Sequence, residues 1–234
     1  KDSFRSLTPD FPQLHLFERE IAEQNGLKAE GHPWLKPVRY PLKSGSPVSP
    51  GVTDFFKVHG SETHEVAVGP VHAGVIEPGH FRFQCHGELV FHLEVALGYQ
   101  HRGIERRLIG GPDKLTGHYI ETLAGDTTIG HSEAYCRAVE ALSATRIPPR
   151  AEALRAIMLE LERLASHTGD LGALSGDVAY LPTASFCGRL RGDFLNITAL
   201  ICGNRFGRGM VIPGGTAFDI DPALAKELKL RLDA

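Results

Sequence analysis

Apolar residues recur at helical spacing in several parts of the chain. Leu14, Phe17 and Ile21 predict a short amphipathic helix that ends at Gly26. After Pro148 and Pro149, a long run repeats apolar residues at intervals of three and four, namely Leu154, Ile157, Met158, Leu161, Leu164 and Ala165. Further helices are predicted over residues 132–142, with Ser132 as the N-cap, over roughly 186–203, and from Pro222 onward.

Between residues 64 and 95 the apolar spacing shortens to two. Apolar and polar residues alternate through 64–68 and 79–95, and Gly87 marks a turn between two strands. This pattern predicts an antiparallel sheet with one face toward water. The predicted fold class is therefore α+β, with a small antiparallel β-sheet followed by a helical bundle and an irregular stretch over 209–215.

Residues 37–54 are rich in Pro, Ser and Gly, a composition that is typical of a linker. We therefore place a linker at 41–60, between a short N-terminal segment, 1–40, and a larger domain, 61–234. The chain starts without an initiator Met and without a signal-peptide pattern, so we expect it to be an interior piece of a longer product.

Composition excludes several classes of protein. The chain has 234 residues and a formal net charge of -3, and it has no run of Lys or Arg that would attract nucleic acid. Its longest apolar stretches are far shorter than the roughly 20 residues that a membrane helix needs. We therefore expect no nucleic-acid partner and no direct membrane span.

The cysteines and histidines match no common metal motif. Cys85, Cys136, Cys187 and Cys202 are too far apart for a C-x-x-C pair, which excludes a zinc ribbon or thioredoxin-type site and favours buried free thiols. The 12 histidines include no H-E-x-x-H pair. Gly207 and Gly209 lack the preceding strand and the following helix of a dinucleotide fingerprint, so no dinucleotide site is predicted there.

Several stretches together resemble a known family. Residues 69–80, 98–105, 121–140, 161–167 and 212–215 resemble the large subunit of energy-converting group 4 nickel–iron hydrogenases and the related 49 kDa-type subunit of respiratory complex I. Residues 11–12, 17–20 and 30–33 separately resemble the tail of the 30 kDa-type subunit, which is fused in front of the large subunit in formate-hydrogenlyase-like proteins. The resemblance implies that 61–234 is the N-terminal part of the large-subunit domain, with the C-terminal part absent.

Two positions depart from the hydrogenase pattern. The resemblance implies metal-binding cysteines at residues 124 and 127, where this chain has Ala124 and Thr127. Alanine has no donor atom, and a threonine hydroxyl is a hard, neutral ligand that does not replace a soft thiolate on nickel. We therefore expect no intact nickel–iron centre and no metal bound by this chain.

The complex I pattern implies quinone-site residues. His72, in the Gly-Pro-x-His turn, matches the family's histidine, and Glu77 in the same turn is a second candidate for proton transfer. The family's tyrosine falls at Gly125, and Tyr119 lies six residues earlier; His131, Arg205 and Tyr119 are the remaining candidates for the quinone cleft. The alternatives are a loop-fixing role for His72, a surface turn at Glu77 and a simple chain turn at Arg205.

Taken together, the resemblance implies a subunit of a membrane-associated oxidoreductase complex. It would form a quinone- or proton-coupled redox site against a small iron–sulfur subunit, as a peripheral protein on the cytoplasmic, inner face of the membrane. The fragment itself would bind no cofactor, except possible quinone, and the iron–sulfur cluster would belong to the partner. The alternatives are a redox-inactive scaffold subunit and a group 4 hydrogenase with atypical ligands. Glu162, Arg163 and His167 lie at helical spacing and predict an ion-paired helix face.

Overall fold

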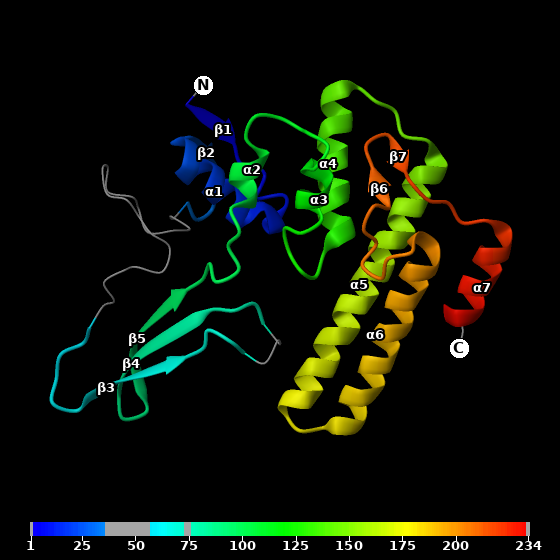
Figure 1. Ribbon diagram of the computed structural model, residues 1–234. Helices are drawn as coiled ribbons and strands as arrows, with labels where there is room; N and C mark the ends of the chain where they lie inside the picture. The colour runs from blue at the N-terminus through cyan, green and yellow to red at the C-terminus, as the bar shows by residue number, and fades with distance from the viewer. Residues whose placement is uncertain (1, 36–56, 73–75, 233–234) are drawn as a thin grey trace. The chain divides into compact units, whose positions relative to one another are not determined.

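The computed structural model describes residues 2–35, 57–72 and 76–232 (Figure 1). The chain forms two compact units, Lys1–Phe56 and Lys57–Ala234. Most of the linker that we predicted at 41–60 lies outside the described residues.

The N-terminal unit is built on one helix. A 3-10 turn, η1 (Pro12–Leu14), leads into α1 (His15–Asn25), and two short parallel strands, β1 (Ser3–Arg5) and β2 (Lys28–Glu30), pair beside it. Gly26 follows α1 with a φ of 65°, a left-handed conformation that glycine adopts without steric cost and that ends the helix. The predicted helix and its stop are confirmed.

A buried carboxylate, Glu18 on α1, ties the helix to the preceding loop. It accepts hydrogen bonds of 2.6 Å from the hydroxyls of both Ser6 and Thr8, and one of 2.7 Å from the Leu7 N–H. Burial alone would raise the pKa of Glu18, but these bonds favour the charged form and lower the pKa to about 2. Glu18 is thus an anion held in place by the protein's own donors.

We expect Glu18→Gln to destabilise the N-terminal unit by about 2 kcal/mol, because the amide cannot accept all of these bonds. The folded pKa lies below the ordinary value of 4.5, so the stabilisation is present above that pH and is lost as the pH falls toward 2. Trp34, the single tryptophan, stacks near Arg19 of α1 and reports unfolding of this unit by fluorescence. The exposed Glu30→Gln is the control, and equal acid-unfolding curves for the two variants would contradict the prediction.

The second unit begins with a three-stranded antiparallel sheet. Strands β3 (Thr63–Val68), β4 (His80–His86) and β5 (Leu89–Ala96) pair in that order, with the turn at Gly87. Register places apolar side chains on one face, which are Val66, Val68, Phe81, Phe83, Leu93 and Val95. The opposite face carries polar and charged residues such as Glu65, Arg82 and Glu94, which confirms the alternation. The face toward water differs from the expectation, because Val66, Val68, Leu93 and Val95 are more than 40% exposed whereas Arg82 and Glu94 are largely buried.

The rest of this unit is helical, which confirms the α+β class. Two long helices, α5 (Pro149–Asp177) and α6 (Leu181–Cys202), run antiparallel side by side, and α4 (Thr128–Ser143) packs on α5 (Figure 1). α7 (Pro222–Leu232) is the last helix. Two short helices, α2 (Ile104–Leu108) and α3 (Thr116–Ile120), were not predicted.

Two details differ from the prediction. α4 begins four residues before Ser132, whose hydroxyl bonds the Thr128 carbonyl inside the helix instead of capping it. The stretch expected to be irregular contains a small hairpin, β6 (Val211–Ile212) and β7 (Gly215–Thr216). Both differences arise from side chains that are distant in sequence, which a local pattern does not reveal.

The helices share one core. Its fully buried members include Ile129, Met158, Ile197 and Met210, which come from three helices and from the loop after α6. Each such side chain contributes roughly 1.5–3 kcal/mol through removal from water. The four cysteines are buried and unpaired with one another, as expected, and burial raises the pKa of the Cys136 thiol to about 11. None of the helices that the structure describes combines the length and apolar character that a membrane crossing requires.

Candidate functional site

Two cavities flank the 124–128 segment, which connects α3 to the N-terminus of α4. The first cavity, of about 500 Å³, lies along α5 and α6; the second, of about 600 Å³, lies between 99–102 and the loop after α6. Gly125, Thr128 and Phe206 line both cavities, so the two spaces meet at this segment. Both volumes fall in the range of small-molecule sites.

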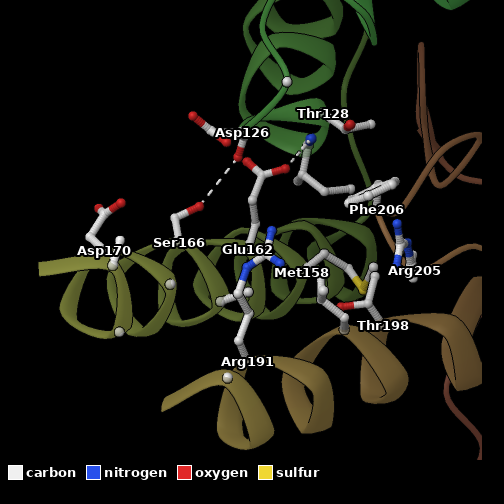
Figure 2. A pocket seen from close by; sticks show the side chains of 18 of the residues that line it. Asp126, Thr128, Met158, Glu162, Ser166, Asp170, Arg191, Thr198, Arg205 and Phe206 are labelled. Carbon is white, nitrogen blue, oxygen red and sulfur yellow. Dashed lines mark hydrogen bonds between the residues drawn. The ribbon is translucent and has the colours of Figure 1, made fainter. Parts of the chain in front are cut away.

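The first cavity has a buried apolar base and a polar open end. Ile129, Met158 and Ala165 form the buried base. Asp170 and Arg191 are exposed members of the lining (Figure 2). Small residues let α5 and α6 approach each other closely here; a Cβ on Gly172 would lie 3.0 Å from the Cβ of Cys187. The cavity therefore suits a ligand with a flat apolar part and a polar edge.

A buried glutamate, Glu121, holds the loop after α6 in place. The Gly209 N–H donates a 2.6 Å hydrogen bond to Glu121, which lines the second cavity. In the wall of the same cavity, the Arg102 guanidinium donates to the carbonyls of Thr122 and Leu123. The walls are thus fixed by contacts within the protein.

Arginines supply positive charge to the first cavity. The Arg205 guanidinium lies 4.5 Å from the ring centre of Phe206, and Arg191 projects from α6 (Figure 2). Within the described part of the chain, no carboxylate pairs with either guanidinium. Both remain able to donate hydrogen bonds to an oxygen atom of a ligand.

The residues at the family's metal positions do not fit a nickel–iron centre. Ala124 offers only a methyl group, and the Thr127 hydroxyl donates a 2.6 Å hydrogen bond to Glu162. No group of three or more His, Cys, Asp or Glu residues among the described residues is arranged to hold a metal ion. The segment therefore lacks the first pair of soft ligands that nickel needs.

His72 closes the turn in which it lies. Its Nε2 atom is 2.7 Å from the Gly79 carbonyl oxygen, and its ring packs edge-on against Phe81 with 5.3 Å between centres. A carbonyl oxygen accepts only from a protonated nitrogen, so Nε2 is the donor in this hydrogen bond. Glu77, in the same turn, is exposed to solvent.

The other predicted residues are not gathered at one place. Arg205 lines the first cavity, but His72, Glu77, His131 and Tyr119 are not among the residues that line either cavity. His131 lies half-buried in the first turn of α4, and the Tyr119 ring lies 5.7 Å from the guanidinium of Arg107.

Sequence reasoning missed the role of Glu162. We expected an ion-paired face formed with Arg163 and His167, but Arg163 pairs with Glu160, and Glu162 turns toward the start of α4. The available signal was the interval of four between Glu162, Ser166 and Asp170, which places all three on one face of α5 and on the wall of the first cavity.

Comparisons with known proteins agree with this architecture. The membrane-bound hydrogenase subunit alpha of Pyrococcus furiosus is 31% identical over 72% of this chain and 39% of its own length. The C/D protein of the NADH-quinone oxidoreductase of Bdellovibrio bacteriovorus is 26% identical over 99% of this chain and 46% of its own length. The chain thus spans less than half the length of these curated relatives. No family model matches it.

A solved structure supports the fold. A chain of an NAD+-reducing [NiFe]-hydrogenase aligns with 73% of this chain and 42% of its own length, with a TM-score of 0.59 and 22% identity. The predicted hydrogenase large-subunit-like architecture is confirmed at the level of the fold.

Proposed function

Since the chain is a homologue of the large subunits of membrane-bound hydrogenases and of the C/D proteins of NADH-quinone oxidoreductases, we propose that it is a subunit of a membrane-associated oxidoreductase complex. In that complex it forms a quinone- or proton-coupled redox site and has no intact nickel–iron centre. The observation that carries this proposal is the 124–128 segment, which has no thiolate and lies where two cavities meet.

The first cavity suits the head group of a quinone. Its lining includes the apolar side chains of Ile129, Met158 and Phe206, on which a flat ring can pack, and Arg205 can donate hydrogen bonds to a carbonyl oxygen. Reduction to the quinol consumes two electrons and two protons, and negative charge develops on the quinone oxygens as electrons arrive. A guanidinium without a carboxylate partner stabilises that charge.

The electrons come from a partner. The four cysteines are isolated in the sequence and buried, so we propose that a small iron–sulfur subunit holds the donor cluster. Residues 1–40 then act as the tail of a 30 kDa-type module and 61–234 as the start of the large-subunit domain. The assembly is peripheral on the inner face of the cytoplasmic membrane, bound to other subunits that cross it.

The test is quinone reduction by the assembled complex with Arg205→Met. We expect the KM for a short-chain quinone to rise about tenfold, equivalent to about 1.4 kcal/mol, because the variant keeps the stem but loses the donors. Arg189→Met is the matched control, since Arg189 lines neither cavity and pairs with Asp193 at 3.0 Å. An unchanged KM would remove Arg205 from the site, and a complex that reduces no quinone would refute the proposed function.

A redox-inactive scaffold is the second candidate function. The contact between His72 and the Gly79 carbonyl favours it, because a ring that is hydrogen-bonded to the backbone can fix a loop without taking part in chemistry. Binding of a quinone analogue separates the two candidates. A hydrogenase with atypical ligands ranks third, and about one nickel per chain after production with hydrogenase maturation factors would establish it.

A further inference from the structure

Glu162 makes an unusual connection between two helices. It rises from the middle of α5 toward the start of α4 (Figure 2). There it accepts three hydrogen bonds. Its Oε2 accepts the Ile129 N–H at 2.7 Å, and its Oε1 accepts both the Thr127 hydroxyl at 2.6 Å and the Gly130 N–H at 3.1 Å. The donors come from the 124–128 segment and from the first turn of the helix that follows it.

The α4 N-terminus needs such a partner. The first N–H groups of a helix have no acceptor within it, and the helix dipole favours a negative charge there. Thr127 occupies the N-cap position but makes no side-chain cap bond, because its hydroxyl donates to Glu162 instead. The carboxylate from α5 therefore replaces a local cap, and it fixes Thr127 at the same time.

The site leaves little freedom for another arrangement. A side chain at Gly130 would overlap the Thr127 hydroxyl, so the small residue permits the close approach of hydroxyl, helix and carboxylate. The same Glu162 lines the first cavity beside Met158 and Ser166. A change in the Thr127–Glu162 contact would thus alter the wall of the cavity directly.

We infer that Glu162 is a positioning residue that fixes the 124–128 segment against α5 through Thr127, in place of the metal ligation that the family pattern implies there. The inference rests on the proposed function, because the segment that Glu162 holds is the wall shared by the two cavities. Glu162 does not itself donate the protons, since three donors already occupy its oxygens. Its contribution is a cavity that keeps its shape without metal.

A substitution cycle tests the contact. Thr127→Val removes the hydroxyl and keeps the shape, whereas Thr127→Ser keeps the hydroxyl. In the chain, we expect Thr127→Val to lower the melting temperature by about 3–6 °C and Thr127→Ser to stay near the wild type. In a Glu162→Met background, which removes both acceptor oxygens, the two should melt alike. Thr168→Val, a hydroxyl on α5 that bonds Leu164 and lines neither cavity, is the control.

Activity of the assembled complex distinguishes positioning from stability. We expect Thr127→Val to raise the KM for a short-chain quinone about fivefold while kcat stays within about twofold, and Thr127→Ser to restore the KM. Additive effects of Thr127→Val and Glu162→Met on melting, or equal behaviour of Thr127→Val and Thr127→Ser, would overturn the inference. Absence of quinone reduction in every form, with the melting cycle as expected, would instead refute the proposed function and leave the contact established.

Discussion

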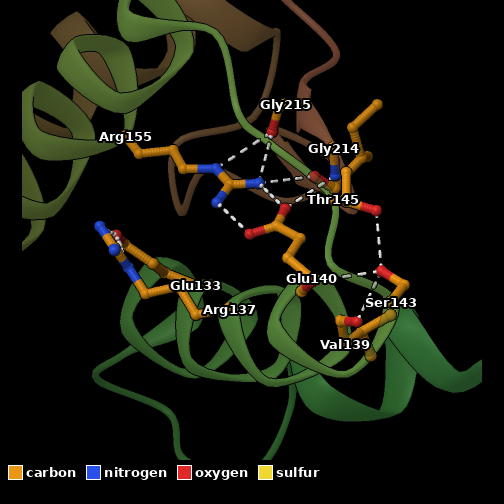
Figure 3. Close-up of polar contacts among 10 residues, drawn as sticks. Glu133, Arg137, Val139, Glu140, Ser143, Thr145, Arg155, Gly214 and Gly215 are labelled. Carbon is orange, nitrogen blue, oxygen red and sulfur yellow. Dashed lines mark hydrogen bonds and ion pairs between the residues drawn. The ribbon is translucent and has the colours of Figure 1, made fainter.

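Arg155→Met is expected to lower the free energy of unfolding by about 3–5 kcal/mol, the range for breaking a buried ion pair. Arg155 is 0% exposed, and its guanidinium bonds both oxygens of Glu140, at 2.7 and 3.1 Å. It also donates to the carbonyls of Ile212 and Gly215, in the hairpin formed by β6 and β7 (Figure 3). Methionine fills the space but removes the cation from beside a buried carboxylate, which keeps only the Gly214 N–H as a donor, and it removes one donor from each of two carbonyls.

The loss of unfolding free energy in Arg155→Met should depend on pH. The hydrogen bonds from Arg155 lower the pKa of Glu140, against the raising effect of burial, so in the wild type this stabilisation is present above the ordinary pKa of 4.5 and is lost below it. Without Arg155, burial raises the pKa of Glu140, and protonation then removes the uncompensated charge. We therefore expect the difference between variant and wild type to be smaller at pH 5 than at pH 8.

Urea unfolding at both pH values measures the effect. Arg150→Met is the matched control on the same helix, because Arg150 pairs with Asp219 at 2.7 Å but both side chains are 63% exposed. Pairs of that kind contribute about 0–1 kcal/mol. Arg155→Met and Glu140→Leu together should recover only part of the loss, since the Ile212 and Gly215 carbonyls still lack the hydrogen bonds from Arg155. A loss below about 1 kcal/mol for Arg155→Met would show that this pair does not hold the hairpin.

This pair also explains why the hairpin was not predicted. Residues 209–215 contain Gly and Pro without any alternation, and their hairpin depends on Arg155 and Glu140, which lie 57 and 74 residues from their partners Ile212 and Gly214. By contrast, α5 was predicted from Pro149 and from its apolar spacing, both of which act within a few residues. Local sequence patterns were therefore sufficient to predict the long helices, whereas the hairpin depends on polar contacts between residues far apart in the sequence.

In the candidate site, too, some residues could be predicted from the sequence, whereas their long-range contacts could not. Ala124 and Thr127 were identified by the position of a motif, and Arg205, a candidate for the quinone cleft, lines the first cavity. The partner of Thr127 was not predictable, because Glu162 is 35 residues away and its helical spacing fitted an exposed ion pair equally well. The start of α4 was placed four residues too late for the same reason, since its cap comes from another helix.

Gly207→Ala is expected to cost about 3 kcal/mol, because strain and overpacking act at one position. Gly207 has a φ of 76°, in the left-handed region, and a Cβ there would overlap the Ile129 side chain and lie 3.5 Å from Met158. Both of those residues are fully buried and form the base of the first cavity.

Gly209→Ala separates the two contributions. Gly209 has nearly the same φ, 74°, but nothing lies within 4 Å of its Cβ position, so strain alone should cost about 1–2 kcal/mol. Adding Ile129→Val to Gly207→Ala removes the methyl group nearest the overlap and should make the double variant lose less than the two single losses together. Urea unfolding measures all four proteins. Equal losses for Gly207→Ala and Gly209→Ala would mean that the loop after α6 does not press on Ile129, and the base of the cavity would then be free to adapt to its ligand.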